Sequence, residues 1–487
     1  MYTVTFLPKG VTVEVEAGTS LLSAGIKAGL RPDAPCGGQG TCGKCRVTVD
    51  GEKVLACQTA IDRDMTVLLP ERGETEILTQ GTGAARTGDG QHEYVLAFDI
   101  GTTTLVGFLL DGASGAQLAS ASAVNPQTQY GADVISRIQI AVAGKEPLLR
   151  CCVAESLGAL TEELVEKARV DINKVGLACV VGNTAMHHLF LGIDPSSLVS
   201  PPYMPTVSAA IEAPISSRLP LSDNAVLRVL PNIAGFVGAD TVGCMVAAGF
   251  DRLRDLTLLI DIGTNGEMVL GDRTRRIACS TAAGPAFEGA KISQGMRGAA
   301  GAVDHVWLEN GEICFHVIGN VEPCGICGSG LLDLVACLLD AGVIDESGRL
   351  EGKKFTFPGT TISLTQKDVR EVQLAKGAIR AGIELMCKKM GVHPEDINTV
   401  LLAGAFGNYM DPASACRIGM IPPCLLDKIR PVGNAAGEGA KLCAVDRKAF
   451  ALAQELASGT EFLELASIPD FQDRFIDALE FCEEEND

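Results

Sequence analysis

The sequence predicts an α+β domain at the N-terminus, followed by a larger α/β body made of two lobes. Three observations lead to this prediction. Four cysteines lie between residues 36 and 57. The turn Asp-Ile-Gly-Thr occurs twice, at Asp99 and at Asp261, 162 residues apart. The chain has 487 residues, which is too long for one hydrophobic core, so two or three domains are expected.

The first twenty residues predict two strands and the start of a helix. Apolar residues alternate over residues 2–6 and 11–15, and Pro8 and Gly10 mark a turn between them. A helix is expected to begin near Thr19 or Ser20, directly before the cysteine loop. This order of strand, strand, helix and cysteine loop resembles the ubiquitin-like (β-grasp) ferredoxin fold over residues 1–72.

The cysteine loop predicts one iron–sulfur cluster. Cys36, Cys42 and Cys45 share a glycine-rich loop, and Cys57 follows in the next segment, so four thiolates can converge on two irons. The first spacer holds five residues, which makes the loop resemble adrenodoxin-like ferredoxins. A structural zinc site is the alternative, but such sites usually pair two Cys-x2-Cys elements, and the first 100 residues contain no second one. We therefore expect a 2Fe-2S cluster.

Composition and charge restrict the class of partner. Lys and Arg number 40 against 60 Asp and Glu, which gives a net charge of −20 and argues against binding to nucleic acid or to anionic lipid. No uncharged apolar run reaches the ~18 residues that a membrane span needs, and residues 1–8 read as a strand rather than a signal peptide. The 18 cysteines fit a reducing compartment. We expect a cytoplasmic protein with no membrane contact.

A glycine-rich stretch separates the cysteine domain from the rest of the chain. Residues 73–93 contain five glycines and no sustained apolar period, which predicts a flexible linker. The linker would let the cluster domain move relative to the body, as an electron shuttle requires.

Two glycine-rich hairpins predict a clamp for nucleotide phosphates. In residues 94–111 and 256–270 an aspartate ends a buried strand, and a turn rich in Gly and Thr leads into a second strand. Asp99 and Asp261 would face a Mg²⁺ ion, while backbone N–H and hydroxyl groups of the turns hold phosphate oxygens. The turn residues are Gly101, Thr102, Thr103, Thr104, Gly263, Thr264, Asn265 and Gly266. The duplication predicts lobes at residues 94–255 and 256–487.

A third element resembles the adenosine motif of the acetate and sugar kinase, heat-shock chaperone and actin superfamily. Residues 400–408 read as a short buried strand that ends in a turn containing Gly404, Ala405, Phe406 and Gly407. The resemblance implies that ATP lies between two lobes, each built on a mixed five-stranded sheet. An ordinary strand-to-helix turn is the alternative for the two glycines. Gly328 and Ser329, at the start of a predicted helix over residues 331–343, are a further candidate phosphate contact.

Ferredoxin and ATPase motifs on one chain resemble the reductive activators of corrinoid proteins. The motifs that carry the resemblance begin at Asp99, Asn125, Tyr130, Gly182, Asp261, Ala283, Gly325 and Ala403. The resemblance implies that ATP drives an electron from the 2Fe-2S cluster to cobalt(II), which regenerates cobalt(I) for methyl transfer. It also implies an upstream electron donor, a nucleotide contact at Gly284 and a water-positioning role for Glu267. The sequence does not decide between a monomer and a homodimer.

Three other functions remain open at this point. The chain could activate another low-potential or radical enzyme, as the activators of 2-hydroxyacyl-CoA dehydratases do, or it could be a small-metabolite kinase of the same fold. A nucleotide-sensing scaffold without enzymatic activity is the third. For Cys324 and Cys327 we expect buried thiols rather than a redox pair, and for His187 and His188 neutral helix residues. The acidic segment 477–487 is expected to be a solvated end.

Overall fold

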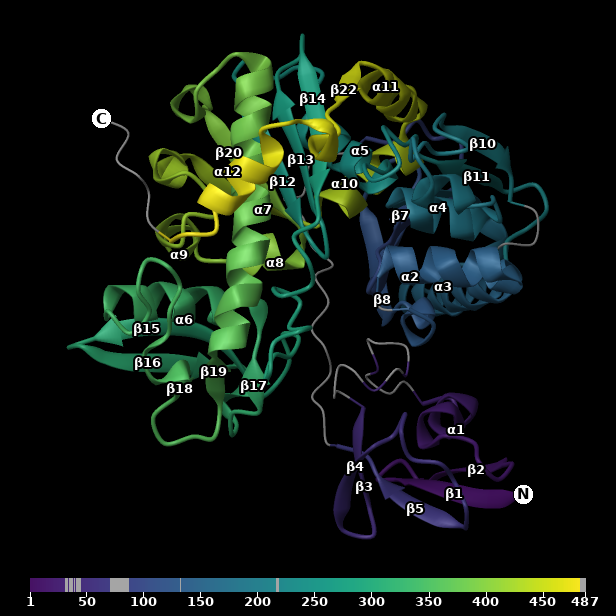
Figure 1. Cartoon of the computed structure of the whole chain (residues 1–487). Coiled ribbons are helices and arrows are strands. Elements are labelled where there is room, and N and C mark those ends of the chain that lie inside the picture. The colour runs from purple at the N-terminus through teal and green to yellow at the C-terminus, as the bar shows by residue number, and fades with distance from the viewer. Residues whose placement is uncertain are drawn as a thin grey trace.

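The computed structural model describes residues 1–30, 34, 38, 40, 45–70, 87–131, 133–215 and 219–481. Figure 1 shows a small N-terminal domain beside a larger body with two lobes. Among the described residues, no helix is long and apolar enough to cross a membrane.

The N-terminal domain has the predicted β-grasp arrangement. Its strand order is β2-β1-β5-β3-β4, with β1 and β5 parallel at the centre. Ser20 caps the helix by accepting a hydrogen bond from the Ser23 N–H, as the sequence predicts. Val4, Phe6 and Val67 lie in the core between sheet and helix. The elements are β1 (Tyr2–Leu7), β2 (Val11–Val15), α1 (Leu21–Lys27), β3 (Arg46–Val49), β4 (Glu52–Leu55) and β5 (Met65–Leu68).

The first lobe, which we call lobe I, is built on a six-stranded sheet of order β10-β11-β9-β6-β7-β8. Helices α2, α3 and α4 cover one face of this sheet (Figure 1). The strands are β6 (Tyr94–Ile100), β7 (Thr104–Asp111), β8 (Gln117–Val124), β9 (Val175–Gly182), β10 (Ile211–Pro214) and β11 (Val226–Val229). The helices are α2 (Val134–Ile140), α3 (Glu146–Ala168), α4 (Thr184–Leu191) and α5 (Ala239–Ala248).

The second lobe, lobe II, repeats this plan with the order β21-β20-β12-β13-β14-β22. In both lobes the aspartate strand pairs antiparallel with the next strand and parallel with a later one. Each sheet has a sixth edge strand, β10 or β22, beyond the five strands expected. The strands are β12 (Thr257–Ile262), β13 (Gly266–Gly271), β14 (Arg276–Thr281), β20 (Thr399–Ala403), β21 (Ile429–Gly433) and β22 (Thr460–Phe462). The main helix is α7 (Gln366–Met390).

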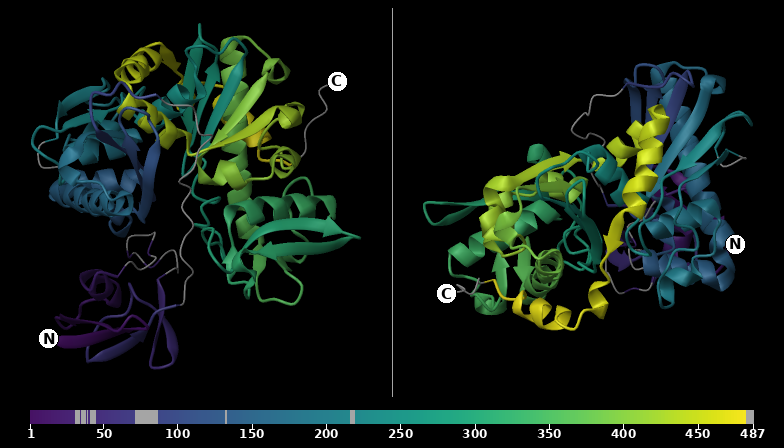
Figure 2. Two further views of the ribbon diagram at one scale, coloured as in Figure 1. Left: turned by 180° about the vertical axis from the view of Figure 1, so that it is seen from behind. Right: turned by 90° about the horizontal axis from the view of Figure 1, so that it is seen from above.

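Helices from both lobes meet between the two sheets. Helix α5 packs against α10 (Ala435–Val445) and α11 (Arg447–Ser458), and one apolar cluster combines residues of both sheets with these helices (Figure 2). Gly243 and Gly439 lie at the crossing of α5 and α10, where a Cβ on Gly439 would come within 2.0 Å of the Gly243 carbonyl oxygen. The absence of side chains at this crossing therefore lets the helices approach closely.

A subdomain extends lobe II between β14 and β20 (Figure 1). It contains β15 (Ala302–Glu309), β16 (Glu312–Val317), β17 (Gly325–Ile326), α6 (Gly328–Asp340), β18 (Lys354–Thr356) and β19 (Ser363–Thr365). The remaining helices of lobe II are α8 (Gly404–Tyr409), α9 (Pro412–Arg417) and α12 (Phe471–Asp477).

Two segments differ from the sequence predictions. Residues 87–93 of the predicted linker are bound to the body, because the Asp89 N–H donates to the Val445 carbonyl and Lys174 pairs with Glu93. The acidic end is not wholly solvated either. Phe481 is buried in the lobe II core, and the Lys376 ammonium lies over its ring. Residues 482–487 lie outside the described residues.

Candidate active site

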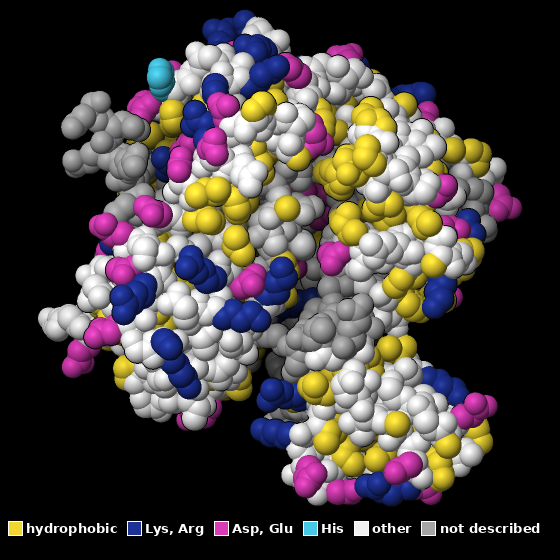
Figure 3. All heavy atoms as spheres, viewed as in Figure 1, with side chains coloured by type: hydrophobic (Ala, Val, Ile, Leu, Met, Phe, Trp, Pro, Cys, Tyr) yellow, Lys and Arg dark blue, Asp and Glu magenta, His cyan; other side chains and the backbone are white. Residues whose placement is uncertain are grey.

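A cleft of about 2660 Å³ lies between the lobes and extends to the N-terminal domain and to the lobe II subdomain, and both glycine-rich hairpins open into it. Figure 3 shows the hollow and the Lys and Arg side chains that gather on the lobe II side below it. Most predicted nucleotide and catalytic residues line this cleft: Asp99, Gly101, Thr102, Thr103, Thr104, Asp261, Gly263, Thr264, Asn265, Glu267, Gly284, Gly328, Ser329, Gly404, Ala405 and Phe406. Gly266 and Gly407 do not line it, since both are buried in packing contacts.

Four carboxyl groups converge on the floor of the cleft. Burial and the neighbouring charges of Asp240 and Asp261 raise the pKa of Asp99 to about 7. Burial and Asp240 raise the pKa of Asp261 to about 7, and burial raises that of Asp240 to about 6. The pKa of Glu267 is also raised, again mainly by burial. A cation near this floor would relieve the repulsion between these groups.

The two hairpin aspartates are held from behind. The Asn434 side-chain amide donates to Asp99 Oδ2 at 3.1 Å, while Asn434 Oδ1 caps helix α10 through the Gly437 N–H. Gly404 has a φ of +81°, and a Cβ there would lie 2.6 Å from Asp261 Oδ1. A glycine at position 404 is therefore required by both the backbone conformation and the adjacent carboxylate.

Buried polar side chains of lobe I fix its phosphate turn. The Arg137 guanidinium donates to the Thr102 carbonyl at 2.5 Å and to the Gly131 carbonyl at 2.9 Å. The Asn125 amide donates to the Gly101 carbonyl, and the Asn183 amide donates to the Thr102 hydroxyl oxygen. These bonds use carbonyl and hydroxyl acceptors, and the Gly101 N–H donates to the Thr104 carbonyl within the turn at 2.9 Å.

Glu288 connects the two hairpins. It lies in the loop between β14 and β15 and lines the cleft. The Thr103 hydroxyl of lobe I donates to Glu288 Oε2 at 3.0 Å, and the Thr264 hydroxyl of lobe II donates to Oε1 at 2.5 Å. One carboxylate thus accepts from both threonines that were predicted to hold phosphates.

An aromatic pair lines another part of the cleft. Phe287 and Phe406 stack with ring centroids 4.5 Å apart and planes 10° apart. A Cβ on Gly328 would lie 2.9 Å from the Phe406 ring and 2.0 Å from the Phe287 carbonyl oxygen. The predicted adenosine turn is itself helical, because residues 404–409 form α8 directly after β20. The strand-to-helix alternative therefore describes its backbone, and Phe406 is among the side chains of this segment that line the cleft.

A direct protein cage for a metal ion is absent from the described residues, where no group of three His, Cys, Asp or Glu side chains has ligand geometry. Mg²⁺ commonly uses one or two carboxylates together with phosphate oxygens and water. The carboxyl groups of Asp99 and Asp261 fit that mode of binding, and they do not fit an all-protein cage.

Two of the four predicted cluster cysteines can be located. Cys45 directly precedes β3 and Cys57 closely follows β4, and the Ala56 N–H donates to the Cys45 carbonyl at 2.8 Å, which brings the two segments together. Gly38 lies close by, since a Cβ there would be 3.8 Å from the Cys57 Cβ. Cys36 and Cys42 lie outside the described residues. Cys45 and Cys57 therefore lie on adjacent segments, which fits two ligands of one cluster.

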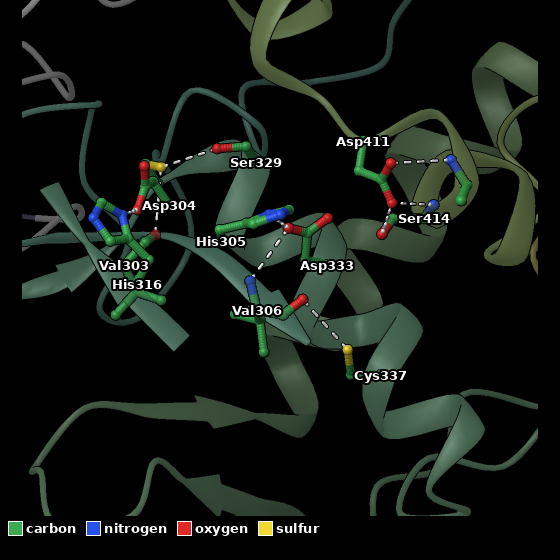
Figure 4. A network of polar contacts seen from close by, with 12 residues as sticks. Val303, Asp304, His305, Val306, His316, Ser329, Asp333, Cys337, Asp411 and Ser414 are labelled. Carbon is green, nitrogen blue, oxygen red and sulfur yellow. Dashed lines mark hydrogen bonds and ion pairs between the residues drawn. The ribbon is translucent and has the colours of Figure 1, made fainter. Parts of the chain in front are cut away.

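The subdomain carries two histidine–carboxylate pairs beside the cleft (Figure 4). His305 Nδ1 contacts the buried Asp333 carboxylate, and His316 Nδ1 lies 2.7 Å from Asp304 Oδ1. Cys327 is buried at the start of α6, as predicted, but Cys324 is exposed, so that part of the prediction is wrong. The segment from 318 to 324 runs along the surface before β17 buries the chain.

The predicted neutral histidines lie in helix α4. His187 and His188 are both buried, and burial lowers the pKa of His187 to about 3 and also lowers that of His188. His188 Nδ1 lies 2.8 Å from the Thr184 carbonyl.

Known proteins match the chain over both of its parts. Residues 4–67 match the 2Fe-2S iron-sulfur cluster binding domain, residues 94–253 the RACo middle region, and residues 255–487 the C-terminal domain of RACo, the ASKHA domain. The corrinoid activation enzyme RamQ of Eubacterium limosum is 36% identical over 413 residues, which cover 79% of this chain and 69% of that protein. The chain belongs to the family of reductive activators of corrinoid proteins.

Further relatives of this activator support the same family. The [Co(II) methylated amine-specific corrinoid protein] reductase of Methanosarcina barkeri is 34% identical over 222 residues, covering 41% of each chain. A solved structure described as a reductive activator for corrinoid, iron-sulfur protein superposes with a TM-score of 0.72 and 28% identity. That superposition covers 99% of this activator and 98% of the solved chain. The predicted ferredoxin and actin-like ATPase folds are confirmed, and members of the family are reductase or activation enzymes.

Sequence reasoning assigned no role to Asp240, Glu288 or Asn434 of the activator. Asp240 is in the first turn of α5, and Asn434 precedes α10, so both read as ordinary helix-start residues. Glu288 lies in the motif that begins at Ala283, but spacing in the sequence does not place a loop residue between two hairpins that are distant in sequence. The topology supplies that information.

Proposed function

We propose that this protein is an ATP-dependent activator that passes single electrons to the cobalt of a corrinoid protein and so regenerates cobalt(I) from cobalt(II). The observation that carries the proposal is the paired arrangement of Asp99 and Asp261 at the floor of one cleft between duplicated lobes, on a chain that also has a 2Fe-2S cluster binding domain. The 36% identity to a corrinoid activation enzyme supports the choice of acceptor.

The nucleotide would lie along the cleft from the stacked phenylalanines to the two hairpins. Those N–H and hydroxyl groups of the turns at residues 101–104 and 263–266 that are not used within the turns would bind phosphate oxygens, and Asp99 and Asp261 would hold Mg²⁺. Glu267 is the residue that we assign to orient the attacking water, because its carboxyl lines the same floor. Two lobes, residues 94–255 and 256–487, would close on the nucleotide from either side. Residues 1–72 would form the electron-transfer domain.

Electron transfer from the 2Fe-2S cluster to cobalt(II) would be uphill, so ATP must supply free energy for it. Two-iron ferredoxin clusters have potentials near −400 mV, and each ~59 mV of uphill one-electron transfer costs about 1.4 kcal/mol. Cys36, Cys42, Cys45 and Cys57 would hold the cluster, which supplies one electron at a time when bound. Closure of the lobes on ATP would favour binding of the cobalt(II) corrinoid protein, and ATP hydrolysis would supply the free energy for the uphill transfer.

An upstream electron donor must reduce the cluster again after each transfer. We assign the protein to the cytoplasm. The 18 cysteines support this compartment, since free thiols persist where the medium is reducing.

A binding titration tests the proposal directly. Corrinoid proteins from methyltransferase systems, set to cobalt(II) or cobalt(I), are titrated against the activator with and without a non-hydrolysable ATP analogue. We expect the analogue to tighten binding of the cobalt(II) form by roughly 5- to 150-fold, and the corrinoid protein to tighten analogue binding by the same factor. Equal affinities in all conditions, with cobalt reduction that needs no ATP, would overturn the proposal. Formation of a phosphorylated small molecule would favour a kinase instead.

A further inference from the structure

We infer that Glu288 is a positioning residue that competes with nucleotide phosphate for the hydroxyl groups of Thr103 and Thr264, so that ATP binding breaks a contact between the lobes. The inference rests on the proposed function for the identity of the ligand. It adds a residue, and a means of coupling, that the family resemblance does not supply.

The two threonine hydroxyls have too few hydrogens to serve both Glu288 and a phosphate. A threonine hydroxyl carries one hydrogen that it can donate. In the structure the Thr103 hydroxyl donates to Glu288 Oε2 at 3.0 Å, and the Thr264 hydroxyl donates to Oε1 at 2.5 Å. Neither hydroxyl can donate to a phosphate oxygen while it donates to Glu288. Phosphate and Glu288 therefore exclude one another as acceptors at these two positions.

The negative charge of Glu288 also opposes a bound phosphate. The Glu288 carboxylate lies between the two turns at which phosphates are proposed to bind. Its negative charge would repel a phosphate group bound at either turn. The buried guanidinium of Arg137, which holds the Thr102 carbonyl, also feels the charge of Glu288. In this structure Glu288 thus makes the polar contacts that a bound anion would make.

The backbone of Glu288 is held rigidly in lobe II. Its loop is a tight turn in which the Glu288 N–H donates to the Pro285 carbonyl at 3.1 Å. Phe287 is buried and stacks on Phe406. Gly289 follows at a φ of +74°, and a Cβ there would lie 2.4 Å from the Met296 carbonyl oxygen. The backbone is therefore fixed to lobe II, and the side chain alone can leave Thr103.

The consequence is a link between phosphate and lobe position. Thr103 belongs to lobe I, whereas Thr264 and Glu288 belong to lobe II, so the carboxylate joins the lobes at the mouth of the phosphate site. A phosphate group that takes both hydroxyls replaces this link with its own. The relative position of the two lobes would then depend on the length and charge of the bound nucleotide. An ATP-driven activator needs such a dependence.

The test measures the affinity of a non-hydrolysable ATP analogue and of adenosine by calorimetry. For Glu288→Gln we expect the analogue to bind about 10-fold more tightly or better, because hydrogen bonds to a charged acceptor are stronger than those to a neutral one. Adenosine has no phosphate, so its affinity should stay within about twofold. Glu371→Gln is the matched control. Glu371 also lines the cleft, but its carboxylate lies 3.9 Å from the Lys291 ammonium and accepts no hydrogen bond from Thr103 or Thr264 in the described part of the structure. It should change neither affinity.

A double substitution separates competition from a general structural effect. In the native background Thr103→Val removes both a phosphate donor and a Glu288 donor, so its effect on analogue affinity should be small. Combined with Glu288→Gln, it should cost several-fold more. Equal costs in the two backgrounds, unchanged or weaker analogue binding in Glu288→Gln, or equal shifts for adenosine would each overturn the inference. Failure of every form to bind the analogue would instead overturn the proposed function.

Discussion

At the level of single residues, the buried aspartates make the stability of the ATPase body depend on pH. The pKa values of Asp99 and Asp261 are raised to about 7 and that of Asp240 to about 6, against 3.8 for an ordinary aspartate. The folded state therefore binds more protons than the unfolded state between these values. The stability contributed by protonation is full below about pH 4 and is lost as the pH rises to about 7.

Thermal unfolding should show this loss. We expect the thermal midpoint of the ATPase body to fall as the pH rises from about 4 to about 7 in the absence of Mg²⁺. Asp240→Asn should flatten the slope, since Asp240 raises the pKa of both other aspartates. Mg²⁺ with an ATP analogue should raise the midpoint more at pH 8 than at pH 6, because the ionised carboxylates bind the cation. A midpoint that rises with pH would contradict this assignment.

Asp261 is the residue whose loss should affect ATP turnover most. We expect Asp261→Ala to lower Mg²⁺-dependent ATP hydrolysis by about 100-fold or more, since it removes one of the two carboxylates proposed to hold Mg²⁺. Phosphate release measures the rate, and the visible spectrum of the cluster should be unchanged. Asp255→Ala, at an exposed site just before the same strand, is the matched control. Hydrolysis at the native rate in Asp261→Ala would show that the second hairpin is structural.

At the level of elements, the crossing of α5 and α10 fixes how the lobes pack. A methyl group on Gly439 would collide with the Gly243 carbonyl oxygen, which belongs to backbone and cannot rotate away. We expect Gly439→Ala to destabilise the ATPase body by about 1–3 kcal/mol. In Gly158→Ala, on α3, the new methyl meets Pro220 at an ordinary 3.6 Å, so the lower backbone entropy of alanine should raise the midpoint slightly. Equal midpoints for the two variants would contradict the close approach at the crossing.

The elements also show what sequence can predict. The hairpins at Asp99 and Asp261 and the strands of residues 1–15 follow from local alternation and glycine turns, and the structure has them where predicted. The sixth edge strands, β10 and β22, are short and pair with distant segments, so local pattern does not reveal them. Glu288 and Asn434 join the site through contacts that span 185 and 335 residues. Such contacts depend on topology rather than on spacing.

At the level of the whole molecule, electron transfer and nucleotide control belong to different parts of the chain. Cys45 and Cys57 flank the β3–β4 hairpin of the N-terminal domain, whereas the hairpin aspartates lie in the two lobes. The two functions should therefore be separable by substitution. Cys57→Ser tests this separation, with Cys151→Ser on the exposed face of α3 as the matched control.

For Cys57→Ser we expect the electron paramagnetic resonance signal of the reduced two-iron cluster to be lost or strongly altered, because a thiolate ligand is removed. ATP analogue affinity, and the tightening of cobalt(II) corrinoid protein binding by that analogue, should both stay within about twofold of the native values, since linkage between these ligands runs through the lobes. Cobalt(I) formation should nevertheless fall to background. If the substitution also removed the effect of the analogue on partner binding, the cluster domain would be part of the switch, and the division of labour between the two parts would be wrong.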